Sequence, residues 1–252
     1  MKIKFLGTGT STGVPEIGCQ CDVCTSTDIR NRRLRASVLV ISGEVRLLID
    51  CSPDFRQQIM DEPFLPIDGV LLTHEHYDHV GGLDDLRPFS KFSDVNIYSN
   101  SITLEALKRR IPYSFSEHKY PGVPTFSLHE IGEHTSFFVQ GVEILPVRLM
   151  HYRLPILGYR MQDFAYLTDV KTIPEEEYSK LEGLDTLVID ALRIEAHIAH
   201  LNLDEALEMI GRIAPKKAYL THLSHHMGLH EDVQKMLPEN VFLSYDALEI
   251  NV

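Results

Sequence analysis

The residues with the clearest chemical potential lie in the segment 73–79, which sets three histidines and one aspartate within six consecutive positions. Imidazole nitrogens and carboxylate oxygens suit Zn, Mn or Fe, and two such ions about 3.5–4 Å apart can activate water between them. On an extended segment, alternation would direct His74, His76 and Asp78 to one side and leave His79 to turn toward a second ion. The spacing therefore predicts a metal site, in preference to ordinary polar side chains at a strand end.

A second cluster places three thiols within six residues, at Cys19, Cys21 and Cys24. Thiolates this close can hold one tetrahedral Zn, which then needs a single further ligand. The alternatives are a disulfide or free thiols. The remaining cysteine, Cys51, follows a strand-like apolar run and is interpreted as a small buried residue. With no signal peptide, no membrane-spanning run and an unpaired cysteine spacing, we expect a reducing, cytoplasmic location and interpret the three thiols as a zinc site.

Other candidate ligands stand alone at the ends of apolar segments further along the chain. His151, Asp169 and His222 each follow such a segment. Strand ends deliver side chains to an edge of the fold, where residues distant in sequence can converge on a cleft. Asp50 also ends an apolar run, and a carboxylate there can accept the free ring N–H of a metal-binding histidine. We therefore expect Asp50 to support the site without binding metal.

These motifs resemble the metallo-β-lactamase superfamily and, within it, the PhnP-like cyclic-phosphate phosphodiesterase branch. The resemblance covers nearly the whole chain. Its matching segments are the cysteine cluster, the histidine segment and the ranges Gly7–Pro15, Ile49–Arg56, Leu157–Arg160, Asp190–Arg193 and Thr221–His225. The sequence departs from the branch at Cys51 and Ser52, which leaves the substrate more open than the chemistry.

The resemblance implies a role for each candidate residue. Its metal ligands are His74, His76 and His151 for one ion, Asp78, His79 and His222 for the other, Asp169 as the bridge between them, and Cys19, Cys21, Cys24 and His225 for a structural Zn. His226, next to His225, is the alternative fourth ligand. The catalytic residues are His200, which precedes a helix start, together with Asp78 and Asp50. Contact of His197 with substrate is left open.

The basic block Arg30–Arg35 follows the cysteine cluster. A run of charges is usually a solvated face, and that is the preferred interpretation here. The alternative is that one or two of these arginines bind a substrate phosphate with their planar guanidinium groups.

The resemblance also implies an α/β fold, a four-layered αββα sandwich with the metal site at one edge of its two sheets. Hydrophobic patterning predicts a hairpin over 36–49, strands over 126–131, 136–149, 184–189 and 218–221, and helices over 174–181, 203–213 and 228–237. Strands followed by helices suit such a sandwich. With 252 residues and no linker or repeat, we expect residues 1–252 to form a single domain.

By resemblance, the function is metal-dependent hydrolysis of a small phosphodiester, such as a cyclic ribose phosphate or a 2′,3′-cyclic nucleotide. A hydroxide held between two Zn or Mn ions attacks phosphorus, and His200 protonates the leaving oxygen or stabilises the pentacoordinate state. Three alternatives remain: an RNA hydrolase similar to the tRNA 3′-end endonuclease, a lactonase or thioesterase, and a noncatalytic metal-binding accessory protein. The chain retains seven ligands for the catalytic pair, which favours an enzyme, and no insertion resembles an RNA-gripping arm.

Composition limits the expected partners. The formal charge is −12, from 24 basic and 36 acidic residues. An acidic surface opposes binding of long nucleic acids, which usually requires a basic face. We expect a small phosphodiester as ligand, no membrane partner and no long nucleic acid, and leave a homodimer open.

Overall fold

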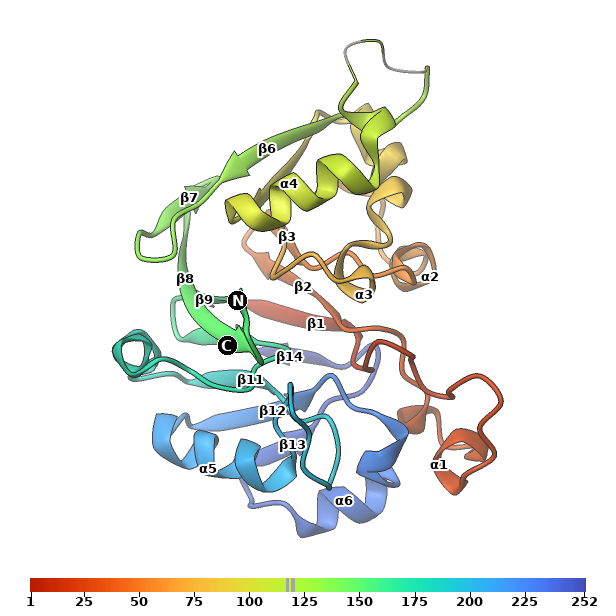
Figure 1. Ribbon diagram of the computed structural model, residues 1–252, viewed down its shortest axis with the longest axis vertical. Helices are drawn as coiled ribbons and strands as arrows, with labels where there is room; N and C mark the ends of the chain where they lie inside the picture. The colour runs from red at the N-terminus through yellow and green to blue at the C-terminus, as the bar shows by residue number, and fades with distance from the viewer. Residues whose placement is uncertain (117, 119–120) are drawn as a thin grey trace.

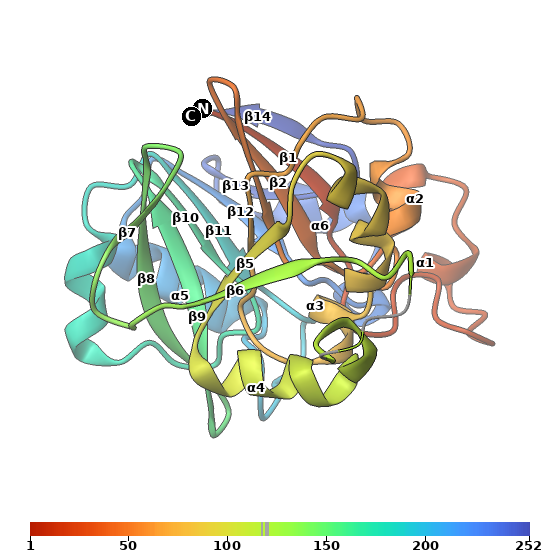
Figure 2. The same ribbon diagram turned by 90° about the horizontal axis from the view of Figure 1, so that it is seen from above.

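The computed structural model describes the chain except for residues 117, 119 and 120. Two seven-stranded sheets face one another and helices cover their outer faces, as Figures 1 and 2 show. The first sheet contains, in chain order, β1 (Lys2–Gly7), β2 (Ser37–Ser42), β3 (Val45–Ile49), β4 (Gly69–Leu71), β5 (Val95–Ser99), β6 (Phe126–Glu130) and β14 (Glu249–Asn251). The second contains β7 (Phe137–Val139), β8 (Val142–His151), β9 (Leu154–Met161), β10 (Phe164–Leu167), β11 (Thr186–Asp190), β12 (Lys217–Thr221) and β13 (Val241–Leu243).

The helices are short and lie outside the sheets. Those of α type are α1 (Asp22–Thr25), α2 (Phe55–Ile59), α3 (Tyr77–Val80), α4 (Ser101–Arg110), α5 (Leu203–Ile213) and α6 (His230–Met236). The 3₁₀ segments are η1 (Ile29–Asn31), η2 (Leu83–Lys91), η3 (Pro112–Ser114), η4 (Glu175–Leu181) and η5 (His225–Met227). In Figure 1, α4 lies with the first sheet, whereas α5 and α6 lie with the second. The predicted αββα sandwich is confirmed.

The sandwich is held together by three apolar layers. The layer between the sheets includes Phe5, Leu71, Tyr159 and Phe164, all fully buried. The two outer layers pack each sheet against its own helices. Because strands in the middle of such a sandwich are buried on both faces, they are apolar throughout, as β10 is at all four positions.

Parallel pairing in both sheets sets the position of the functional residues. In the first sheet β3, β4 and β5 run parallel, and in the second β10, β11 and β12 do. The carboxyl ends of parallel strands meet at the same edge of a sheet, and ligands of open α/β sheets bind at such an edge. Side chains that follow β3, β4, β10, β11 and β12 are therefore brought together.

Most of the predicted elements are present. The hairpin is formed by β2 and β3, in which Val38 pairs with Ile49, and α5 matches the predicted range. Asn202 and Glu205 close a capping box at the start of α5, which explains why the helix begins at Leu203.

Three predictions about local structure were wrong. The strand predicted over 136–149 is the hairpin of β7 and β8, because Gln140 and Gly141 take φ values of +48° and +84° and reverse the chain. The helix predicted over 174–181 is the 3₁₀ segment η4. The extended course expected through Asp78 ends at His76, since α3 begins at Tyr77.

No helix in the described part of the chain is long and apolar enough to cross a membrane.

Candidate metal centre

Backbone conformation aims several residues into the edge of the sandwich. Asp50 follows β3, Asp169 lies just past β10, and His222 follows β12, with φ values of +59°, +54° and +59°. A left-handed conformation costs roughly 1–2 kcal/mol for a residue with a side chain, and less for Asp. Such residues concentrate at functional sites, where the surrounding structure holds them in place.

One group of three histidines combines both sheets. His74 and His76 come from the loop after β4, His151 ends β8, and the nearest ring nitrogens of the three lie within 4.8 Å of one another. His151 Nδ1 donates a hydrogen bond to the carbonyl of Ala199 at 2.9 Å, because a carbonyl can only accept. Its Nε2 is therefore the unprotonated nitrogen of the neutral ring, with a lone pair available for an ion. Burial lowers the pKa of His74 and of His151, which keeps both in the neutral form that binds metals.

The second group is composed of two carboxylates and two imidazoles. Asp78, His79, Asp169 and His222 are all buried and offer ligand atoms within 4.8 Å of one another. His79 Nε2 lies 3.2 Å from Asp78 Oδ2 and 3.0 Å from Asp169 Oδ2. Burial opposes charge on the two carboxyl groups, yet the nearby histidines outweigh it and hold both pKa values below the ordinary range. The predicted assignment of Asp78 is compatible with this group, although the alternation that paired it with His74 and His76 does not occur.

Asp169 lies where the two groups adjoin. Besides its contacts in the second group, it has an oxygen within 4.8 Å of ring nitrogens of His151 and His200. That is the position a bridging carboxylate requires.

The donor sets fit divalent cations. The Nε2 atom of His74 is buried and makes no hydrogen bond to any described residue, and that of His79 has the carboxylates of Asp78 and Asp169 beside it. A buried polar atom without a partner is costly in water-free surroundings, and an imidazole lone pair is satisfied by a cation. The seven residues predicted from the sequence are therefore brought together in two adjacent groups, and their binding of metal stays a prediction.

Asp50 occupies the supporting position predicted for it. Fully buried, it accepts a hydrogen bond from His79 Nδ1 at 2.6 Å and another from the backbone N–H of Thr73 at 2.8 Å. The first bond fixes the His79 tautomer, so that Nε2 faces the second group.

His200 lies beside both groups. Its ring centroid is 4.6 Å from that of His151 and 4.9 Å from that of His222, and its Nδ1 donates to Asp190 Oδ2 at 3.1 Å. Burial alone would lower the pKa of His200, but the charge of Asp190 outweighs it and raises the pKa to about 9. The pairing with Asp190 therefore favours the protonated form of His200, which is the form that can donate a proton. His197 lies 5.2 Å from it, ring to ring.

Asp190 lies at the site, although the sequence analysis included it only in a matching segment and assigned it no role. Its other oxygen, Oδ1, lies 3.6 Å from His222 Nδ1, so that one carboxylate lies between a predicted metal ligand and the predicted catalytic histidine. The available signal was the same as for Asp50, a carboxylate at the end of an apolar strand.

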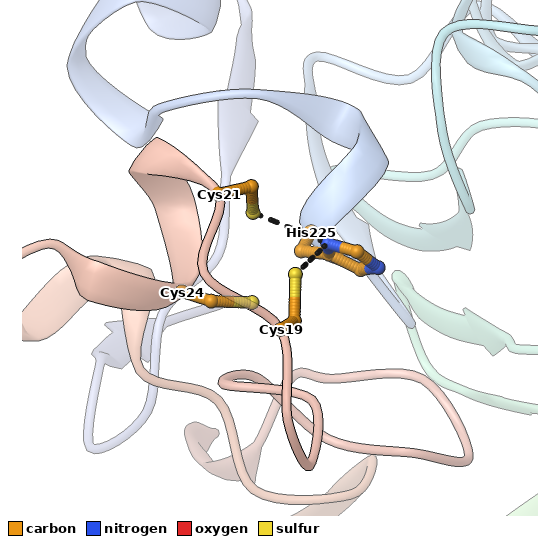
Figure 3. Close-up of side chains that lie close together, drawn as sticks. All are labelled: Cys19, Cys21, Cys24 and His225. Atoms are coloured by element: carbon orange, nitrogen blue, oxygen red, sulfur yellow. Dashed lines mark hydrogen bonds between the residues drawn. The ribbon is translucent and has the colours of Figure 1, made fainter.

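The cysteine cluster closes around one histidine, as Figure 3 shows. Cys19 Sγ and Cys21 Sγ lie 3.4 and 3.3 Å from His225 Nδ1, and Cys24 completes the group. His225 belongs to this group and His226 does not. A hydrogen bond from the backbone N–H of Cys24, assisted by His225, lowers the pKa of Cys21 to about 6 and favours the thiolate. All four cysteines of the chain are free of disulfides. The sulfurs of Cys19, Cys21 and Cys24 together with one ring nitrogen of His225 make four ligand atoms, which fit a tetrahedral Zn.

The arginines of the basic block form internal contacts. Arg30 pairs with Asp28, and Arg35 pairs with Asp54. Arg33 is only 6% exposed and donates to Thr8 Oγ1 and to the carbonyl of Ser244. The solvated face expected for the block is therefore wrong at Arg33, which joins the N-terminal loop to the end of the chain.

Three comparisons relate this chain to known proteins. A model of the beta-lactamase superfamily domain matches residues 45–223. A crystal structure described as a new diphosphatase from the PhnP family is 38% identical, with a TM-score of 0.92, and the match covers 100% of this chain and 97% of that one. Zn²⁺-bound PqqB from Methylobacterium extorquens has a TM-score of 0.81 over the whole of both chains, and at 19% identity it shows the fold alone.

Among curated proteins, an octanoyltransferase of Porphyromonas gingivalis is 44% identical over 251 residues. The match covers 99% of this chain and 51% of that protein, so the chain spans about half the length of this relative.

Proposed function

We propose, on the premise that this chain belongs to the beta-lactamase superfamily and to its PhnP family, that the protein is a metal-dependent phosphodiesterase acting on small phosphodiesters. Members of the superfamily are generally metal-dependent hydrolases. The observation that carries the proposal is the convergence of seven potential ligands in two adjacent groups, with the His200–Asp190 pair beside both. The similar PhnP-family structure is described as a diphosphatase, which also acts at phosphorus.

We propose two divalent ions, Zn or Mn, at the paired groups and one structural Zn at the cysteine group. When bound, the pair supplies Lewis-acid activation of water and offsets negative charge on the phosphoryl oxygens. His200 then donates its proton to the leaving oxygen, because it is the protonated group next to the ligands. Asp190 orients that imidazole, and Asp50 fixes the ring of His79.

Acyl hydrolysis is a second candidate, favoured by the name of the octanoyltransferase. A site that activates water can attack a carbonyl carbon as well as phosphorus. That relative is about twice as long as this chain, however, so its named activity can belong to the half without a counterpart here. A thioesterase or lactonase therefore ranks behind a phosphodiesterase.

A substrate screen of the metal-loaded protein tests the proposal. The compounds are bis(4-nitrophenyl) phosphate, 2′,3′-cyclic nucleotides, a dinucleoside diphosphate, a lactone and an octanoyl thioester. Hydrolysis of the diesters above the rate of Asp78→Ala supports the proposal. Turnover of the thioester or the lactone alone would establish acyl hydrolysis, and cleavage of the diphosphate alone would establish a diphosphatase.

We further propose that residues 1–252 form one domain in a reducing, cytoplasmic setting. The layer between the sheets draws on β1 and β14 from the two ends of the chain as well as on β10 and β11, which supports a single unit. The four free thiols support the compartment. The net charge of −12 favours a small ligand over a long nucleic acid.

A further inference from the structure

The loop that carries His200 has little apolar packing of its own. This loop, residues 193–202, joins β11 to α5 and is called here the His200 loop. It has no regular secondary structure, and its apolar side chains Ile194 and Ile198 are exposed. Of residues 193–202, all of which the structure describes, Leu201 alone belongs to the apolar core. Apolar packing therefore anchors the loop on one side of His200, and polar contacts must hold the other side.

Two consecutive backbone carbonyls of the His200 loop accept hydrogen bonds from side chains outside it. His151 Nδ1 donates to the carbonyl of Ala199 at 2.9 Å, and Lys171 Nζ donates to the carbonyl of His200 at 3.2 Å. His151 is one of the proposed metal ligands, and Lys171 lies two residues after Asp169, the proposed bridge. The loop is thus tied, directly before and at His200, to the two segments that supply the metal centre.

Lys171 is itself held at both ends. Its backbone N–H donates to the carbonyl of Met150 at 2.8 Å. Its ammonium group lies 2.7 and 2.8 Å from the two carboxylate oxygens of Glu205, and Glu205 is fixed in turn by the capping box with Asn202. An ammonium group has three N–H donors, so the contacts with Glu205 leave one for the carbonyl of His200. The lysine therefore presents that donor from a fixed position.

The two attachments of His200 hold different parts of the residue. Asp190 Oδ2 holds the ring through Nδ1 at 3.1 Å, whereas Lys171 holds the backbone through the carbonyl. One hydrogen bond leaves the ring free to rotate about it, and a fixed backbone removes that freedom. A proton donor must lie within hydrogen-bond reach of its acceptor, so the backbone attachment bears directly on the proposed role of His200.

We infer that Lys171 is a positioning residue, which holds the backbone of His200 so that the imidazole stays beside the metal centre. The inference rests on the proposed phosphodiesterase function and on the role of His200 in it. Lys171 acts through His200, so its loss should affect the step in which His200 gives up its proton and leave the other steps unchanged. A lysine that only stabilised the fold would affect all substrates alike.

The test uses Lys171→Met, which keeps the length of the side chain and removes the ammonium group. The matched control is Lys180→Met. Lys180 is about as buried as Lys171, with side chains 15% and 22% exposed, and it likewise pairs with a glutamate and donates to backbone carbonyls. Its contacts join η4 to β8 and to Glu133, outside the His200 loop.

Two kinds of measurement are made on the metal-loaded proteins. The first is kcat for a 2′,3′-cyclic nucleotide and for bis(4-nitrophenyl) phosphate, with Lys171→Met introduced both into the wild-type protein and into His200→Ala. The second is hydrogen exchange by mass spectrometry on peptides that span residues 194–201, which requires no turnover.

We expect Lys171→Met to lower kcat for the cyclic nucleotide by roughly 10- to 100-fold, since a misplacement of about 1 Å can cost about 100-fold in rate. The loss for bis(4-nitrophenyl) phosphate should be much smaller, because nitrophenolate departs with little help from a proton. In His200→Ala the same substitution should cause no further loss, because the effects of residues that act as a unit are not additive. Residues 194–201 should exchange faster in Lys171→Met, and Lys180→Met should keep the wild-type exchange and the wild-type ratio of the two kcat values.

Three results would overturn the inference: equal losses for the two diesters, a further loss in the His200→Ala protein, or unchanged exchange of residues 194–201. If Lys171→Met does not fold, Glu205→Gln takes its place. That variant removes the charge that holds the ammonium group and keeps an oxygen for the backbone N–H of Asn202. It should give the same pattern with smaller losses, and absence of the pattern would overturn the inference.

The inference and the proposed function fail in different ways. Faster exchange in Lys171→Met, in a protein whose wild type hydrolyses no diester, would contradict the function and leave the attachment of His200 standing. Diester hydrolysis by the wild type, with unchanged exchange and equal losses in Lys171→Met, would contradict the inference and leave the phosphodiesterase standing.

Discussion

Replacing His200 by alanine separates proton donation from metal binding. His200 is 8% exposed, and its Nδ1 already donates to Asp190 at 3.1 Å while lying 3.8 Å from Asp169 Oδ1. The seven ligand positions are supplied by other residues, so both ions should stay bound in His200→Ala. Removal of a positioned acid costs roughly 10²–10⁴-fold in rate, and we expect that loss for a diester with an alkoxide leaving group.

The leaving group gives the sharpest measurement. Nitrophenolate departs with little help from a proton, so the loss for bis(4-nitrophenyl) phosphate should be at least tenfold smaller than for a 2′,3′-cyclic nucleotide. The assay is kcat for both substrates, with metal content measured by mass spectrometry on the same samples. His129→Ala, an exposed histidine bonded to Asn96, is the control and should change neither.

Each other outcome has a definite meaning. Equal losses for the two leaving groups would refute proton donation and favour stabilisation of the transition state. Loss of one ion would show that His200 is a ligand, as the alternative groups of His200 with Asp169 and His151, or with Asp190 and His222, would allow. Unchanged rates for both substrates would remove His200 from the mechanism.

Three further predictions concern metal binding and stability. Asp78→Ala should abolish hydrolysis and lower the metal content without unfolding the protein. The control is Asp84→Ala, which removes a carboxylate paired with an arginine at the surface and should keep wild-type activity and metal content. Full turnover in Asp78→Ala would contradict the paired-ion site. Cys21→Ser should release one Zn and lower the melting temperature, because structural Zn contributes to folding; the same Zn content and melting temperature as in the wild-type protein would rule out a metal site there. Burial and nearby arginine charges lower the pKa of His230 to about 4. Between pH 4 and about 6.5, His230 therefore binds a proton more readily in the unfolded chain than in the folded protein, so the free energy of unfolding falls as the pH falls. His230→Gln should remove about 2 kcal/mol of the loss in unfolding free energy between pH 7 and pH 5, measured by denaturant titration, while His129→Gln should show the wild-type slope.

The predicted ligands could be found from the sequence because metal binding is demanding in residue type and spacing. Histidines at 74, 76 and 79 with Asp78 form a dense local pattern, and Asp169 shares with His222 the position at the end of an apolar run. Such a position becomes informative only when parallel strands bring several ends to one edge, as β10, β11 and β12 do. The choice of His225 over His226 rested on resemblance, and the structure places His225 in the cysteine group.

Other features could not be predicted because they depend on tertiary contacts. Asp190, like Asp50, lies at the end of an apolar strand. Only tertiary packing shows that the Asp190 carboxylate lies next to both His200 and His222. The start of α3 at Tyr77 was missed because the alternation of His74 and His76 continues by chance to Asp78 in the sequence. Propensity is a weak guide over so few residues, and the ring of Tyr77 against Gly81 is a contact made only once the helix exists.

Backbone conformation gives independent support to the location of the site. Eight described residues other than glycine have positive φ, and four of them, Asp50, Tyr152, Asp169 and His222, lie at or directly beside the histidine and carboxylate groups. If the left-handed conformation only served to turn the chain, glycine or asparagine would do so at lower cost in free energy. Three of the four supply or orient a proposed ligand, so their side chains explain why a costly backbone conformation is tolerated. Tyr152 differs from these three, because like Gln140 and Gln162 it is the first residue of a two-residue hairpin turn, and such a turn itself requires a positive φ.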